Sequence, residues 1–151
     1  MSRVSLLDVN LLIALFDPDH IHHEVAHDWF ADSREEGWAT CPVTENGFVR
    51  VLSSPSYGGE VFRVADLVER LQTFCSARDH SFWEGGVSLR DETLFRPQSV
   101  AGHRQLTDVY LLGLARRMRG RLATFDRTIP LGAVVGATRN DLAVIAQDNR
   151  S

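Results

Sequence analysis

The sequence contains no lysine. Its 16 basic residues are all arginine, they face 20 acidic residues, and the formal net charge is -4. Proteins that bind nucleic acid usually carry a basic surface, so the overall charge does not favour nucleic acid as a partner. Arginine binds phosphate through two parallel hydrogen bonds, which lysine cannot form. Any phosphate contact by a basic side chain must therefore come from individual arginines.

Cysteine is scarce as well, and long apolar runs are absent. Cys41 and Cys75 have no paired spacing, which favours small buried thiols in a reducing cytoplasm. No apolar run approaches the ~20 residues that span a bilayer. The first apolar segment carries Asp8 early and has no small-residue cleavage site after it. We therefore expect a cytoplasmic protein without a membrane segment or a signal peptide.

The composition is that of an ordinary globular protein, with 44% hydrophobic and 24% charged residues. A length of 151 residues favours one domain with a single core, spanning residues 1–151. Short apolar strands are expected at 3–7, 37–41, 80–83, 121–125 and 142–146. Helices are expected at 9–16, 22–34, 42–52, 61–77 and 108–119, and the segment 84–102 is expected to be irregular. This alternation predicts an α/β fold with a mostly parallel central sheet flanked by helices and right-handed crossovers.

Two of these helices have specific expected features. In the helix 61–77, the apolar spacing predicts that Val61, Val64, Ala65 and Val68 face the core. In the helix 108–119, Thr107 is expected to be the N-cap and Gly120 the C-terminal glycine. The stretch "GHRQ" that precedes it is interpreted as a polar loop.

The elements around Asp108 and Asp126 predict that the two carboxylates meet. A helix from Asp108 to Arg119 extends about 18 Å away from its start. The following strand returns about 16 Å, which brings Asp126 back to the level of Asp108. Asp8 directly follows the first strand, and Glu45 begins the helix after the second. The carboxyl ends of parallel strands share one edge of the sheet, so we expect four acids at this edge.

Four neighbouring carboxylates repel one another unless their pKa values rise or a cation neutralises them. Ligands that are all oxygen atoms suit Mg²⁺ or Mn²⁺ and do not suit zinc. Such an ion is usually completed by water and phosphate oxygens, and it can activate a water for attack on a phosphodiester. The pattern therefore favours nuclease chemistry.

Four stretches, "LLDVNLLIAL", "TENGFVRVL", "GHRQLTDVYLLGLA" and "LATFDR", together resemble a PIN domain, specifically the VapC toxins of bacterial toxin–antitoxin modules. The resemblance runs in order from position 5 to about 127 and implies a three-layer fold. It also implies a metal-binding and catalytic quartet of Asp8, Glu45, Asp108 and Asp126, with Asn10 as a polar neighbour and Thr107 orienting a carboxylate or a water. The resemblance further implies Mg²⁺- or Mn²⁺-dependent cleavage of RNA, a homodimer, and inhibition by a cognate antitoxin.

The sequence allows two interpretations for several residues. Arg104 and Arg127 lie beside the predicted acids and are candidates for RNA phosphate contacts, or simply surface residues. A dense histidine cluster is formed by His20, His22, His23 and His27. Solvent-exposed histidines at the start of a helix are a simpler interpretation of this cluster than a zinc site. A phosphatase that forms a phosphoaspartate would need a lysine, and this chain has none. A PIN-fold protein that only binds RNA or a partner remains the alternative to an enzyme.

Overall fold

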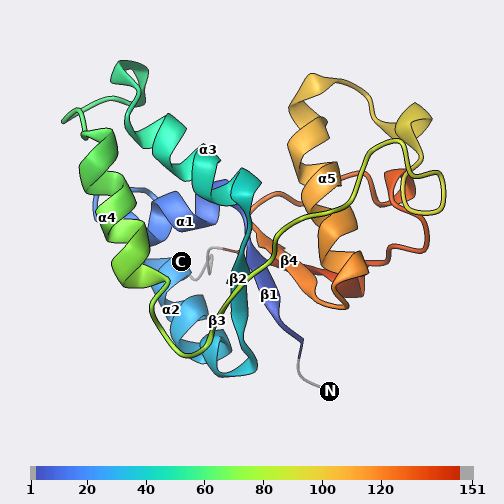
Figure 1. Ribbon diagram of the computed structural model, residues 1–151, viewed down its shortest axis with the longest axis horizontal. Coiled ribbons are helices and arrows are strands. Elements are labelled where there is room, and N and C mark those ends of the chain that lie inside the picture. The colour runs from blue at the N-terminus through green and yellow to red at the C-terminus, as the bar shows by residue number, and fades with distance from the viewer. Residues whose placement is uncertain (1–2, 147–151) are drawn as a thin grey trace, which may run out of the picture.

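The computed structural model describes residues 3–146 and contains a five-stranded sheet with helices on both faces (Figure 1). The strands are β1 (Ser5–Leu7), β2 (Trp38–Thr40), β3 (His80–Phe82), β4 (Arg121–Thr124) and β5 (Leu142–Val144). Their order is β3-β2-β1-β4-β5 and every pair is parallel, so the expected mostly parallel sheet is here entirely parallel. The α-helices are α1 (Val9–Phe16), α2 (His23–Ser33), α3 (Pro42–Leu52), α4 (Val64–Phe74) and α5 (His103–Arg117).

The sheet separates two apolar cores because successive strand residues point to opposite faces. Leu6 and Leu122 pack in the core under α5, whereas Leu7 and Ala123 pack in the core formed with α1 to α4. Figure 1 shows these four helices on one side of the sheet and α5 on the other. All three residues of β1 are buried, as expected for a parallel strand covered on both faces. The arrangement is a three-layer α/β fold.

The strand order reverses between β1 and β4. The chain builds β2 and β3 on one side of β1 and then returns to add β4 and β5 on the other. Leu7 pairs with Ala123, so the carboxyl ends of β1 and β4 lie side by side. Asp8 and Asp126 follow these two strand ends. In open parallel sheets, this reversal point opens a crevice in which ligands bind.

Helix α5 begins at His103, five residues earlier than predicted, so the prediction that Thr107 caps it was wrong. The N-cap is Gly102, and the side-chain oxygen of Gln105 accepts a 2.7 Å hydrogen bond from the backbone N–H of Ala101. This contact satisfies a backbone donor that lies just before the helix. The stretch "GHRQ" is thus the start of α5 and not a loop. Asp108 consequently lies in the second turn.

Gly120 follows the end of α5, as predicted, but it does not have the left-handed conformation that usually favours glycine there. The residue with positive φ is Arg119, at 59°. A Cβ atom at Gly120 would lie 2.5 Å from the carbonyl oxygen of Val4 and 2.6 Å from the ring of Trp83. Glycine is required here because β4 enters the sheet through a very close approach to the neighbouring backbone.

Helix α4 is shorter than predicted and faces the core with different residues. Its buried side chains are Leu67 and Leu71. The four residues predicted to face the core are exposed instead, namely Val61, Val64, Ala65 and Val68. The apolar face of this helix is wider than the part of it that is buried. Periodicity alone therefore predicted the wrong apolar residues to face the core.

The histidine cluster completes the end of α1. A ring nitrogen of His23 lies 2.7 Å from the carbonyl oxygen of Ala14, and one of His27 lies 2.7 Å from that of Leu15. The last carbonyls of a helix have no partner within it, so these histidines satisfy backbone acceptors. None of the helices within residues 3–146 has the length and apolar character to cross a membrane.

Candidate active site

Asp8 is buried at the carboxyl end of β1, where it is also the N-cap residue of α1. Its Oδ2 atom accepts a 2.7 Å hydrogen bond from the hydroxyl group of Thr124, the last residue of β4. Burial raises the pKa of Asp8, while the Thr124 hydrogen bond and the backbone N–H groups of Val9 and Asn10 oppose the rise. The negative charge of Asp126 adds to the rise. Burial therefore disfavours the charged form of Asp8, and only a few hydrogen-bond donors favour it.

Asp126 follows β4 by two residues and is held by the adjoining turn. Its backbone N–H donates to the Thr124 hydroxyl oxygen at 3.1 Å. Its Oδ1 atom accepts hydrogen bonds of 2.7 Å from both the backbone N–H and the hydroxyl group of Thr128. These two donors lower the pKa of Asp126. This carboxylate is thus ionised and fixed in orientation.

Asp108 approaches the two strand ends from α5. Burial, together with the charges of Asp8 and Asp126, raises the pKa of Asp108 to about 7, and burial is the largest of these causes. The neighbouring side chain of Asp126 adds to this rise, and the same contact lowers the pKa of Asp126. The structure therefore brings these three predicted acids into one electrostatically coupled group.

In the described part of the chain, the protein supplies no ion-pair partner for this group. Within residues 3–146, no ion pair joins an arginine or histidine to any of the three aspartates. The available metal ligands in this group are all carboxylate oxygens, and such ligands suit Mg²⁺ or Mn²⁺. The three carboxylates do not bring one oxygen each within 4.8 Å of one another. Two oxygens bound to one Mg²⁺ at about 2.1 Å lie at most about 4.2 Å apart, so in this arrangement at least one of the carboxylates would reach the ion through a bound water.

Glu45 does not join the three aspartates. It lies in the first turn of α3, as predicted, but its Oε2 atom accepts a 2.7 Å hydrogen bond from the hydroxyl group of Thr40. Ligand atoms of Glu45, Cys75 and His80 all lie within 4.8 Å of one another. Glu45 is not among the charges that shift the pKa of Asp8, Asp108 or Asp126. Strand-end topology predicts where the backbone of Glu45 lies, whereas the local donor on β2 decides where its side chain points.

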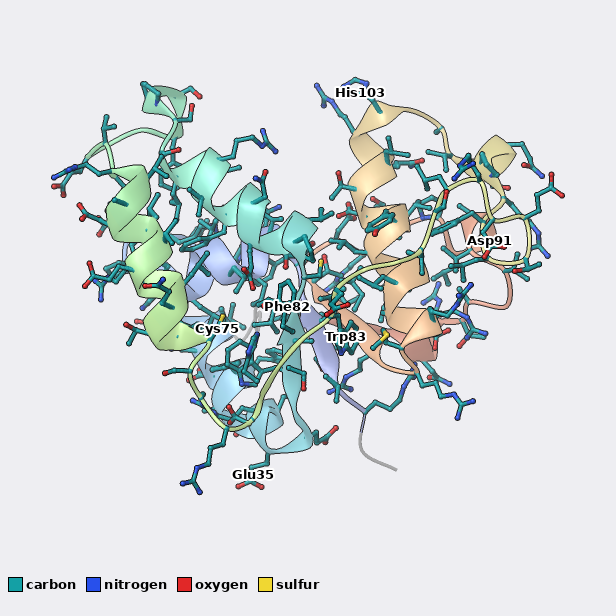
Figure 2. The ribbon with its side chains drawn as sticks, in the orientation of Figure 1. Glu35, Cys75, Phe82, Trp83, Asp91 and His103 are labelled. Carbon is teal, nitrogen blue, oxygen red and sulfur yellow. The ribbon has the colours of Figure 1, made fainter. Side chains whose placement is uncertain are left out.

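The other predicted residues lie around the group at the surface. Asn10 is exposed in the first turn of α1, and Thr107 is exposed on α5 directly before Asp108. Arg104 is exposed in the first turn of α5, next to His103, which Figure 2 shows at the outer end of that helix. Arg127 is exposed beside Asp126 and borders a surface cavity of about 570 Å³ that Arg139 also lines.

Thr124 is the functional candidate that the sequence reading missed. Its hydroxyl donates to Asp8 and accepts from the backbone of Asp126, so it links two of the three aspartates. A threonine at the end of an apolar strand is otherwise explained by its preference for strands. The signal available in the sequence was its position, two residues before an acid that follows the strand.

Comparison with known proteins gives the same fold and an enzyme family. The PIN domain family model matches residues 5–131. Ribonuclease VapC44 of Mycobacterium tuberculosis is 44% identical over 141 residues, which cover 93% of this chain and 99% of that protein. Ribonuclease VapC39 of the same organism is 40% identical over 132 residues, covering 87% of this chain and 95% of that protein. Ribonuclease VapC38 is 43% identical over 123 residues, covering 82% of this chain and 85% of that protein. The chain therefore belongs to the VapC family of PIN-domain proteins.

Proposed function

We propose that this protein is a Mg²⁺- or Mn²⁺-dependent endoribonuclease that acts as the toxin of a toxin–antitoxin module. The observation that carries the proposal is the coupled group of Asp8, Asp108 and Asp126, in which the pKa of Asp108 is raised to about 7. A group of this kind is stabilised by a divalent cation. The similarity to proteins named ribonuclease over most of the chain supports RNA as the substrate.

The three aspartates would hold the ion, and Glu45 belongs to this proposal as the fourth acid. A bound Mg²⁺ or Mn²⁺ would supply positive charge for the scissile phosphate and acidify a water for its hydrolysis. The chain's own residues prepare the site. Thr124 orients Asp8, and the two donors of Thr128 orient Asp126. Asp108 must lose its proton before it can act as a ligand, because a neutral carboxylic acid binds a metal ion poorly.

RNA binding is proposed for arginines around this edge of the sheet. Arg127 follows Asp126 directly, and together with Arg139 it lines the cavity beside the site. Arg104 is exposed on the first turn of α5, the helix that carries Asp108. Arginine contacts to phosphate would position the backbone without reading the sequence. The proposed partners are RNA, a cognate antitoxin and a second copy of this chain, in the cytoplasm.

A second candidate function is favoured by the position of Glu45. Its carboxylate is hydrogen-bonded to Thr40 and is grouped with Cys75 and His80. If it stays there, the site has three acids, and the protein is a weak catalyst that mainly binds RNA or a protein partner. The two candidates differ in turnover and not in binding.

The test is cleavage of RNA by the purified protein in the presence of Mg²⁺ or Mn²⁺. We expect the parent to cut, EDTA to stop it, and Asp8→Asn or Asp108→Asn to lose at least about a hundredfold in rate, a loss typical of removing one electrostatic group from a catalytic site. Asp28→Asn, an exposed acid on α2, is the matched control for loss of one charge. Mapping RNA 5′ ends after brief expression, beside Asp8→Asn, would define the target.

Two outcomes separate the candidates. Cleavage by Asp8→Asn at the parent rate, unaffected by EDTA, would show that the aspartates hold no catalytic metal. RNA binding without metal-dependent cleavage by the parent would instead favour the binding protein.

A further inference from the structure

A second group of metal-binding side chains lies on the α3–α4 side of the sheet. Glu45 comes from the first turn of α3, Cys75 follows the last residue of α4, and His80 is the first residue of β3. One ligand atom of each lies within 4.8 Å of the others. Figure 2 shows Cys75 at the end of α4, next to the ribbon of β3. Three elements thus deliver an oxygen, a sulfur and a nitrogen to one place.

The hydroxyl group of Thr40 lies among these three ligands. It donates to Glu45 Oε2 at 2.7 Å, lies 2.8 Å from Nε2 of His80 and is 4.0 Å from Sγ of Cys75. A hydroxyl group has one proton, and here it is donated in the hydrogen bond to Glu45. The Nε2 atom of His80 is therefore the donor in the hydrogen bond with Thr40. Thr40 is fully buried in β2, so it fixes the carboxylate and the imidazole from a rigid element. The ligands are therefore held close together before any ion binds, and His80 must give up its Nε2 proton if this nitrogen is to bind the ion.

The donor set differs in kind from that of the three aspartates. Thiolate, imidazole and carboxylate together select a borderline-soft ion of the zinc class, whereas Mg²⁺ prefers oxygen alone. We propose that Glu45, Cys75 and His80 bind a divalent ion of this class, at a site separate from the three aspartates. Zn²⁺ is the representative ion, and the proposal does not depend on the proposed nuclease function.

The site is open to solvent on one side. Glu45, Cys75 and His80 are each half-buried, and all three line a surface cavity of about 710 Å³. The cavity gives an ion a route of entry. Three protein ligands leave one position of a tetrahedral ion free, and a water can fill it from the cavity.

Cobalt(II) is the probe for this site because a cobalt–thiolate bond produces an intense charge-transfer absorption that oxygen and nitrogen ligands do not. We expect Co²⁺ added to the reduced parent protein to give this band at one equivalent. Zn²⁺ should displace it, because Zn²⁺ binds such ligands more tightly than Co²⁺, and excess Mg²⁺ should not. Cys75→Ser should lose the band, and His80→Ala should bind Co²⁺ at least about tenfold more weakly.

Cys41→Ser is the matched control. Cys41 is the only other cysteine and is the buried N-cap residue of α3, a position at which serine is a preferred residue. This variant should keep the band, and Asp8→Asn should keep it as well. Circular dichroism would establish that each variant is folded. Absence of the band in the folded parent, or an equal band in folded Cys75→Ser, would overturn the proposal.

Discussion

The hydroxyl group of Thr124 donates a 2.7 Å hydrogen bond to Oδ2 of Asp8, across the pair of strands at which the sheet reverses its order. The same oxygen accepts the backbone N–H of Asp126. One buried threonine therefore sets the relative position of two carboxylates that arrive from β1 and β4. Loss of a polar side chain that orients a metal ligand commonly weakens metal binding.

We predict that Thr124→Val weakens Mn²⁺ binding about tenfold to a hundredfold, as loss of such an orienting partner usually does. The hydrogen bond favours the ionised form of Asp8, so its loss should also raise the pKa of Asp8 further. Mn²⁺ binding followed by calorimetry measures the effect. Thr124→Ser restores the hydroxyl and should recover most of the affinity. Equal affinity in the valine and serine variants would show that the hydroxyl does not position Asp8.

The raised pKa of Asp108 predicts a pH-dependent penalty on stability without metal. The pKa is about 7 in the folded state against 3.8 ordinarily, so the folded protein binds the proton more tightly than the unfolded chain. The penalty is absent below about pH 4, grows as the pH rises, and is complete above about pH 7. Asp108→Asn removes it. We expect the variant to gain up to about 4 kcal/mol over the parent between about pH 4 and about pH 8.

Urea unfolding in EDTA at several pH values measures this difference. The comparison with Asp28→Asn, an exposed acid, corrects for the general effect of removing a negative charge. A gain for Asp108→Asn that is constant across the pH range would contradict the assignment of the raised pKa to this carboxyl.

The position of Glu45 predicts that zinc inhibits the proposed RNA cleavage. An ion held by Glu45, Cys75 and His80 would keep the carboxylate away from the three aspartates. We expect one equivalent of Zn²⁺ per protein, with Mg²⁺ in excess, to slow cleavage by the parent at least about tenfold, as loss of a residue that supports a metal site commonly does. Each variant is compared with its own zinc-free rate. Cys75→Ser should show much less inhibition, and equal inhibition of both proteins would assign the effect to zinc at the aspartates.

Gly113 on α5 predicts a stability effect that is independent of both metal sites. A Cβ atom at this position would lie 2.3 Å from two ring carbons of Phe95, so the helix and the ring cannot both keep their places. We expect Gly113→Ala to lose about 1–3 kcal/mol of unfolding free energy, as overpacked cores do. At Gly132 an added Cβ would meet nothing within 4 Å. Gly132→Ala should therefore change the thermal midpoint little, and a similar fall for both variants would count against overpacking.

The succession of strands and helices along the chain could be predicted from the sequence, and so could the meeting of three aspartates. Both follow from short-range patterns. Asp8 and Asp126 each follow an apolar strand, and parallel strands end at one edge. The start of α5 was predicted wrongly although the signal was local. Gly102 is the N-cap and the Gln105 side chain bonds back to Ala101, whereas Thr107 was the more familiar capping residue.

The sequence by itself determined which residues reach the reversal point of the sheet, since the chain order and periodicity fix where each backbone segment ends. Only the tertiary structure decided where the side chains point and which of them are charged. Glu45 turns to the Thr40 hydroxyl on β2. Asp108 retains a proton near neutral pH because burial and two neighbouring carboxylates oppose its ionisation. Both outcomes depend on contacts between residues far apart in the chain, which no local pattern encodes.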